Sequence, residues 1–218
     1  MERLEAALDW AQSIDLESVA TDLQSIGFEC TRCGRCCSGT AAEPHTATVF
    51  PDEVREIQDA TGQDWAAIAR PMPFGIRDGA GETFEWALQT AEDGDCVFLR
   101  TEGDGTRCSI YDTRPLLCQT YPFRLALPGT GAPGDTAVAA EGRVRASECP
   151  GLGRPLSRER ALAIAETLRD RAVRELRETI ALRDRYEPRP DQDGIVVHDS
   201  EGAKRADGRA LDDSGDNY

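Results

Sequence analysis

The stretch Cys30-Thr-Arg-Cys33-Gly-Arg-Cys36-Cys37 places four cysteines within eight residues. Thiols crowded in this way are held together either by disulfide bonds or by a metal. Four more cysteines follow along the chain, at Cys96, Cys108, Cys118 and Cys149. We therefore expect the rest of the chain to fold so that these four distant cysteines return to the loop at 30–37.

The spacing within this loop is typical of metal ligands. Its C-x2-C-x2-C part matches the start of the bacterial ferredoxin run, in which three thiolates hold one cubic iron–sulfur cluster. Two-residue spacing also lets both sulfurs of a pair turn towards one centre, which is why zinc sites use it. The ferredoxin run continues with three residues and a Cys-Pro, whereas here Cys37 follows at once and the only Cys-Pro is the distant Cys149-Pro150. The chain is therefore not a ferredoxin.

The adjacent pair Cys36 and Cys37 affects how the eight thiols divide. Neighbouring side chains leave the backbone in different directions, which makes the two awkward partners in one tetrahedral site. Eight thiolates with such a pair fit two four-ligand centres, or a cluster beside a structural zinc. The alternative is that some are ordinary buried cysteines, which behave as small apolar residues. That alternative is weak for the four in the loop and stays open for Cys96 or Cys149 taken singly.

Charge near the cysteines is a further consideration. Cys118 lies near the start of a predicted short helix, where the helix dipole lowers the pKa of a thiol. Arg114 and Arg124 are close in sequence and would offset the negative charge of a thiolate cluster. An ion pair at a helix end is an equally good interpretation of both arginines.

The composition fits a small domain that a metal stabilises. At 218 residues the chain matches one domain with a tail, and only 39% of its residues are hydrophobic and 6% aromatic, which limits the core. We predict an α+β fold, a small irregular metal-stapled domain with short antiparallel strands in its middle and helices at both ends. The expected organisation is N-terminal helices at 1–27, a cysteine-cluster metal-binding domain at 28–150, a long amphipathic helix at 151–186 that packs on it, and an acidic, polar, partly disordered C-terminal extension at 187–218.

The net charge of −15 excludes partners that need a cationic face, so we expect neither nucleic acid nor a membrane surface as a partner. Of the 25 basic residues only Lys204 is a lysine. Excess acid with almost no lysine indicates a very salty cytosol, as in a halophilic archaeon, where salt screens the repulsion. Loss of secondary structure on desalting would support this hypothesis, and full stability in dilute buffer would contradict it.

The expected location is cytoplasmic. The first ten residues carry acidic side chains where a signal peptide needs a basic start and an apolar run, and no stretch reaches the length of a membrane span. Disulfides are rare in the cytosol, which favours metal over disulfide bonding.

Periodicity and turn residues predict the main elements. Helices are expected over 1–27, from Pro51 to Thr61, over 64–70, briefly over 113–120, and over 157–186, the last being the clearest. Strands are expected at 46–50 and 82–90, the latter with Phe84, Trp86 and Leu88 on one face. Hairpins are expected from 95–100 with 107–111, placing Cys96 and Cys108 on neighbouring strands, from 123–127 with 136–146, and from 194–199 with 206–210. Residues 212–218 are predicted to be disordered.

The order Cys30-x2-Cys33-x2-Cys36-Cys37, Cys96-Val-Phe-Leu and Cys108-Ser-Ile-Tyr-Asp-Thr-Arg-Pro-Leu-Leu-Cys118-Gln-Thr-Tyr-Pro-Phe123 resembles the YkgJ-type cysteine-cluster family, a zinc- or iron-chelating CxxCxxCC domain also described as iron–sulfur oxidoreductase-like. The resemblance covers roughly residues 28–150, and all eight cysteines fall where the family's eight are expected. It implies metal chelation by these cysteines. One branch of the family includes a flagellin lysine N-methylase. Gln119 stands where members often carry arginine.

Other motifs are set aside. The GxGxxG pattern at 129–134 is interrupted by Pro133, and no helical period follows, so a hairpin loop is the better interpretation. His45 is interpreted as a surface-loop histidine that could also be a ligand. His198 is expected in a turn.

The resulting prediction is a metal-binding protein in which eight cysteines hold an iron–sulfur cluster, of the 4Fe-4S type, with a second metal centre as an option and a redox or electron-transfer role towards an unidentified protein partner. The ligands are Cys30, Cys33, Cys36, Cys37, Cys96, Cys108, Cys118 and Cys149. The alternatives are a structural zinc module that binds a protein partner, and an enzyme similar to the lysine N-methylase.

Overall fold

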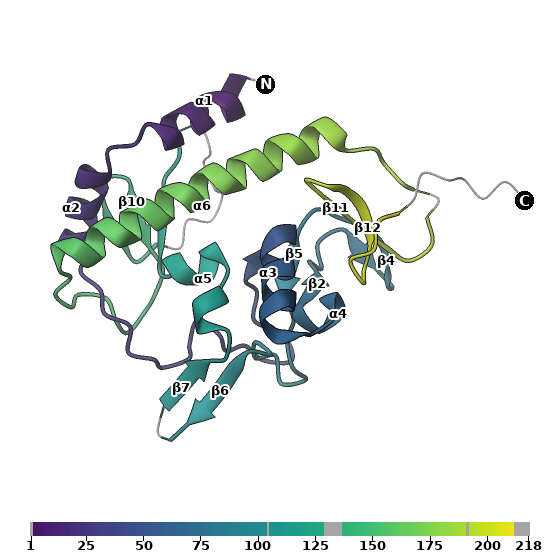
Figure 1. Ribbon diagram of the computed structural model, residues 1–218, viewed down its shortest axis with the longest axis horizontal. Coiled ribbons are helices and arrows are strands. Elements are labelled where there is room, and N and C mark those ends of the chain that lie inside the picture. Colours follow the sequence, from purple (N-terminus) through teal and green to yellow (C-terminus); the bar gives the residue numbers. More distant parts are fainter. Residues whose placement is uncertain (1, 104, 129–136, 191, 212–218) are drawn as a thin grey trace, which may run out of the picture.

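The computed structural model describes residues 2–103, 105–128, 137–190 and 192–211. Its longest element is helix α6 (Arg158–Arg185), which crosses the molecule and has the other elements arranged along it (Figure 1). Helices stand at the start and towards the end of the chain, and short, mostly antiparallel strands lie between them and after the last helix. The predicted α+β class is therefore confirmed.

Three helices pack against one another through small and aliphatic side chains and form a layer. It consists of α1 (Glu2–Gln12), α2 (Leu16–Ile26) and α6. The Asp15 carboxylate accepts a hydrogen bond from the Glu17 backbone N–H and so caps α2, and Gly27 ends this helix with a φ of 73°. The buried side of α6 follows the helical period and faces α1 and α2. It consists of Ala161, Ala165, Leu168, Ala172 and Leu176.

A second core surrounds the antiparallel sheet β1-β5-β2. Its strands are β1 (Thr48–Val49), β5 (Trp86–Leu88) and β2 (Ala69–Pro71), and it packs against α3 (Pro51–Thr61) and α4 (Trp65–Ile68). Helix α3 begins at the predicted proline. Helix α4 is shorter than predicted, because residues 69–71 pair with β5 instead, and a residue before proline avoids the helical conformation.

The predicted strand at 82–90 is wrong in its extent, since two strands in different sheets share this segment. Strand β4 (Ala80–Thr83) pairs with β3 (Ile76–Arg77), and β5 lies at the centre of the other sheet. Trp86 and Leu88 are buried as expected, but Phe84, between the two strands, is 45% exposed. Alternation predicted the faces of β5 and could not reveal the change of sheet.

The last strands pair with a strand from the middle of the sequence. Strand β11 (Ile195–Asp199) runs parallel to β4 and antiparallel to β12 (Gly202–Arg205), giving a sheet of order β12-β11-β4-β3. The hairpin was predicted, but its second strand is 202–205 and not 206–210, because the chain turns directly after Asp199. His198 is therefore on a strand, and its predicted position in a turn is wrong.

Short elements carry the distant cysteines. Strands β6 (Leu99–Glu102) and β7 (Gly105–Cys108) form the predicted hairpin, but Cys96 lies before β6, so only Cys108 is on a strand. A 3-10 turn (Tyr111–Thr113) and helix α5 (Leu116–Thr120) follow. Strand β8 (Phe123–Leu125) then pairs with β10 (Val144–Ala146), which also pairs with β9 (Ala139–Glu141). The GxGxxG pattern at 129–134 and the tail at 212–218 lie outside the described residues.

Among the helices of the described segments, none is both long and apolar enough to cross a membrane.

Candidate metal centre

All eight cysteines line a single cavity of about 490 Å³. The cavity lies where two cores meet. The thiols of the distant segments Cys96, Cys108 and Cys118 pack with Cys37 against the core around β5, and Cys149 packs against the core between α2 and α6. The expectation that the distant cysteines return to the loop is met by this arrangement.

The loop itself is irregular and is held by β7. Residues 29–47 form no helix or strand, and Gly34 turns the chain with a φ of 75° while its carbonyl accepts the Cys37 N–H. The Thr106 hydroxyl and backbone N–H both donate to the Arg32 carbonyl. A Cβ on Gly34 would lie 2.9 Å from the Thr106 Oγ1, so only glycine allows this close approach. The turn therefore places the loop against the strand that ends in Cys108.

A second clamp comes from the segment before β6. The Cys96 N–H donates to the Cys37 carbonyl over 2.8 Å, and the Asp95 carboxylate accepts the Gly39 N–H over 2.9 Å. The Gly94 carbonyl accepts the His45 N–H. These three bonds hold the end of the cysteine loop beside Cys96.

Three of the distant thiols receive a backbone N–H from the residue two positions later. Phe98 donates to Cys96, Ile110 donates to Cys108, and Gly151 donates to Cys149, the last with an N–S distance of 3.4 Å. In each case the bond opposes the rise in the pKa of that thiol, because it favours the thiolate. A thiolate that accepts hydrogen bonds from backbone N–H groups is suited to ligate a metal. Such bonds also tune the reduction potential of a bound cluster.

The adjacent cysteines do not point apart. The Sγ atoms of Cys36 and Cys37 lie 3.8 Å apart, so the predicted divergence of this pair is wrong. The turn closed by the hydrogen bond from Cys37 to Gly34 brings the two side chains to one side of the backbone. The hydrogen bond between these two thiols lowers the pKa of Cys36 to about 7 and raises that of Cys37.

Burial controls the other thiols. It raises the pKa of Cys96 to about 11 and that of Cys118 to about 12. The predicted lowering of the Cys118 pKa by the helix dipole is therefore wrong. Helix α5 has only five residues, and the loss of hydration outweighs its dipole. These thiols must lose their protons when a metal binds.

Mutual repulsion reveals which thiols are near one another. The pKa of Cys149 is raised by burial and then by Cys33, Cys36 and Cys30, in that order. The pKa of Cys118 is raised by burial and then by Cys96, Cys108 and Cys36. Cys37 is also close to Cys96 and Cys118. Two groups of thiols thus meet at the pair Cys36–Cys37.

The charges around the cavity differ from those of the whole chain. Five arginines and only two acidic residues line it, in a protein with a net charge of −15. The arginines are Arg32, Arg35, Arg107, Arg114 and Arg160. The guanidinium of Arg114 lowers the pKa of Cys36 and counteracts the rise at Cys108 and Cys118, which supports the charge-offsetting role predicted for this residue. Arg124 is on β8, outside this lining.

Further polar groups of the lining were not predicted as part of the site. Arg32, Arg35 and Arg107 were passed over, although two lie inside the cysteine motif and the third precedes Cys108. Gln119 donates to the Arg114 carbonyl over 2.6 Å and so fixes the segment before α5. His45 is partly buried in the lining, and its Nε2 has no hydrogen-bond partner within the described part of the chain. Its Nε2 atom could therefore ligate a metal in the cavity, so His45 is not simply a surface residue.

The donor set fits a thiophilic metal, but the donors do not converge on a point. Within the described ranges, no three His, Cys, Asp or Glu side chains are close enough together to hold one ion. Soft thiolates select zinc, copper(I) and iron–sulfur clusters over hard cations. The cavity thus offers the right ligand chemistry around a space wider than a single ion requires.

Comparison with protein families gives a match to the family described as "CxxCxxCC: Putative zinc- or iron-chelating domain", over residues 29–150. This is more than half of the 218 residues. The chain belongs to this family. Comparisons with curated proteins and with solved structures found no match. The matched residues run from just before Cys30 to just after Cys149, so the CxxCxxCC domain contains all eight cysteines and the cavity they line, and the description supports chelation of zinc or iron by this domain.

Proposed function

We propose that the cysteine cavity holds an iron–sulfur cluster beside a second metal centre, and that the protein transfers electrons through it. The observation that carries the proposal is that eight thiols surround one cavity of about 490 Å³ without three converging on a point. A single zinc ion needs four donors within about 2.3 Å of one position. A cluster of several iron and sulfide ions bridges thiolates that are further apart.

The two groups of thiols give the division of ligands. Cys30, Cys33 and Cys36, with Cys149 as the fourth, would hold the cluster, because Cys149 is close to these three. Cys37, Cys96, Cys108 and Cys118 would hold the second centre. When bound, the cluster supplies one-electron redox chemistry. The chain's own contribution is the set of N–H bonds to the thiolates, the positive charge of Arg114, and the partial exposure of the cluster ligands.

That exposure defines where a partner would approach. Cys30, Cys33 and Cys36 are exposed, whereas Cys96 is buried. Electrons would therefore enter and leave at the edge of the cavity formed by the loop, next to Arg32 and Arg35. We expect an anionic protein redox partner at this edge, because the arginines there are the local exception to an acidic surface.

A structural zinc module is the second candidate, and a separate observation favours it. The separation of 3.8 Å between the sulfurs of Cys36 and Cys37 equals the edge of a tetrahedron whose metal–sulfur bonds are about 2.3 Å long. Both cysteines would then bind one ion, and the protein would be silent in redox assays. Its role would be to present a stable surface to a protein partner.

The test is anaerobic purification followed by a visible spectrum and counts of iron, zinc and acid-labile sulfide per chain, on the wild type, Cys33→Ser and Cys108→Ser. The proposal requires that Cys33→Ser loses iron and sulfide together, whereas Cys108→Ser keeps them and loses only the second metal. Glu43→Gln, exposed in the same loop, is the control and should keep the full content. A colourless wild type with zinc and no sulfide would overturn the cluster and establish the zinc module.

A further inference from the structure

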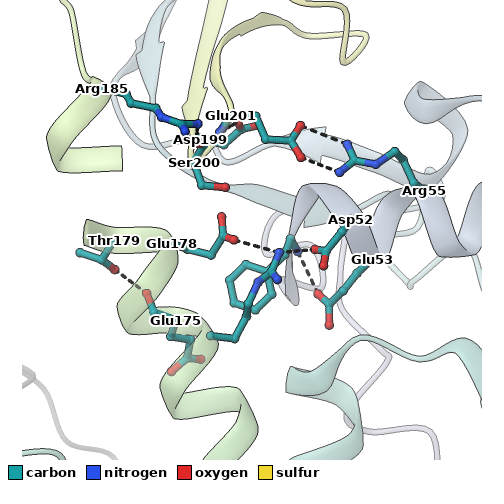
Figure 2. A network of polar contacts seen from close by, with 12 residues as sticks. Asp52, Glu53, Arg55, Glu175, Glu178, Thr179, Arg185, Asp199, Ser200 and Glu201 are labelled. Carbon is teal, nitrogen blue, oxygen red and sulfur yellow. Dashed lines mark hydrogen bonds and ion pairs between the residues drawn. The ribbon is translucent and has the colours of Figure 1, made fainter. Parts of the chain in front are cut away.

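A second cavity, of about 580 Å³, lies between the C-terminal half of α6 and the β1-β5-β2 sheet. It shares no lining residue with the cysteine cavity. Glu175, Glu178 and Thr179 line it from one face of α6, and Asp199 and Ser200 line it from the end of β11 (Figure 2). Its volume is in the range of small-molecule sites, about 300–1,000 Å³.

Aromatic side chains form a large part of its wall. They are Phe50, Phe74, Phe84 and Trp86. Phe74 is 72% exposed and Phe84 is 45% exposed, so both rings keep surface open to solvent, although the Phe84 ring also stacks on His198 and meets Tyr186 edge-on. The face of an aromatic ring attracts organic cations, and most strongly those with a low cost of desolvation, such as ammonium groups that carry alkyl substituents.

The charges of the wall are all negative. Glu85, Glu175, Glu178 and Asp199 line the cavity, and no lysine or arginine does, although the chain has 25 basic residues. Three of these carboxylates are paired with cations that stand outside the lining. Arg171 pairs with Glu175 at 2.7 Å, Arg174 with Glu178 at 2.9 Å, and Lys204 with Asp199 at 2.7 Å.

Glu85 is the exception. Its carboxylate makes no hydrogen bond or ion pair with any described residue, and it lies near enough to Glu175 for the two negative charges to repel. Although the residue as a whole is exposed, partial loss of hydration first, and this repulsion second, raise the pKa of Glu85. A positive charge bound between the two carboxylates would relieve both effects.

We propose that this cavity binds a small organic cation, an alkylammonium or quaternary ammonium compound, with its charge beside Glu85 and Glu175 and its carbon atoms against Phe84 and Phe74. A bare metal ion fits less well. No three carboxylates among the described residues converge on one point, and aromatic rings are not ligands for hard cations. The proposal is independent of what the cysteines bind.

The test is calorimetric titration of the folded, metal-loaded full chain with n-butylammonium and with choline, and with n-butanol as the neutral analogue. Both cations should bind and n-butanol should not. Glu85→Gln should weaken the binding of both cations about tenfold, because it removes one of the two negative charges beside the bound cation. Phe84→Leu keeps the apolar volume but removes the ring, and should weaken choline more than n-butylammonium. Cys33→Ser should leave binding unchanged, which separates this test from that of the cysteine cavity.

Glu56→Gln is the matched control, because it removes one negative charge from the exposed face of α3, outside the cavity. It should change the affinity less than twofold, since surface substitutions have small effects. Equal weakening by Glu56→Gln and Glu85→Gln would overturn the proposal, because it would mean attraction to the acidic surface as a whole. No binding of either cation, or binding of n-butanol as tight as that of n-butylammonium, would also overturn it.

Discussion

The helical layer and the cysteine region are ordered by different means. In the layer of α1, α2 and α6, the buried stripe of α6 is at most 4% exposed and both N-caps on α2 and α6 are formed by side chains. Ion pairs such as Arg183 with Glu5 add contacts at the surface. In the cysteine region, residues 29–47 have no regular structure, and three of its thiols are exposed. The layer is stabilised by packing, whereas the loop is fixed mainly by a few hydrogen bonds.

The difference indicates where a metal matters. Exposed thiols bury little apolar surface, and a long irregular loop costs conformational entropy that must be offset by something else. In the helical layer that compensation is hydrophobic burial. In the cysteine region, ligation is the available source. We therefore expect a packed helical scaffold beside a site whose order depends on a bound metal.

Removal of the metal should have the largest effect and should be confined to one region. Anaerobic chelation is expected to abolish hydrogen-exchange protection at 30–40 and 94–110 and to leave α2 and α6 protected, because a structural zinc can contribute about 10–16 kcal/mol to folding. Exchange measured by mass spectrometry before and after chelation checks this. Loss of protection throughout the chain would mean that the scaffold does not stand by itself.

Truncation of a buried side chain in the helical layer should lower the stability of the protein and leave its metal content unchanged. Leu168 is 1% exposed in the contact of α6 with α2, so Leu168→Ala should lower the free energy of unfolding by about 2–5 kcal/mol. The metal content of the folded protein should stay unchanged. Leu162→Ala, on the same helix and only partly buried, should cost less. Denaturant titration with metal analysis measures both. Metal loss in Leu168→Ala would contradict the division into two regions.

The sequence could predict features that depend on local signals, but not those that depend on contacts between distant segments. Helix α6 and the start of α3 at Pro51 were predicted from periodicity and proline, which are local signals. The gathering of the cysteines followed from their chemistry. The parallel pairing of β11 with β4 and the change of sheet after Thr83 depend on contacts between distant segments, which no local pattern encodes. The pKa of Cys118 was mispredicted for the same reason, because burial is a property of the assembled cavity.

One side chain connects the β1-β5-β2 core to the helix that carries Cys118, and its substitution should have an intermediate effect. The Glu53 carboxylate accepts the Phe50 N–H over 2.9 Å at the start of α3 and the Leu116 N–H over 2.7 Å at the start of α5, which carries Cys118. Glu53→Gln leaves one of these donors without an acceptor and should cost about 1–3 kcal/mol. It should also speed the loss of metal to a chelator. Glu56→Gln, on the same helix and exposed, should change neither quantity, and an unchanged chelation rate in Glu53→Gln would show that α5 is held without this link.

The smallest effect is expected far from the cysteines, at the C-terminal hairpin. Arg55, which contacts Glu201 in Figure 2, and then Lys204 lower the pKa of Glu201 to about 2. A carboxyl group whose pKa is lowered by folding stabilises the folded state above its ordinary value of 4.5 and loses this contribution as the pH falls towards 2.

Glu201→Gln should therefore flatten the acid limb of the stability curve between about pH 4.5 and pH 2 by less than about 1 kcal/mol, because its side chain is 39% exposed and solvent screens the pair. Thermal unfolding across this pH range measures the effect, with Glu92→Gln on an exposed loop as the control. The metal content at neutral pH should be the same in all three proteins, since the hairpin contributes no residue to the cysteine cavity. A variant that lost metal would place the hairpin within the cysteine region and break the division between the two parts of the molecule.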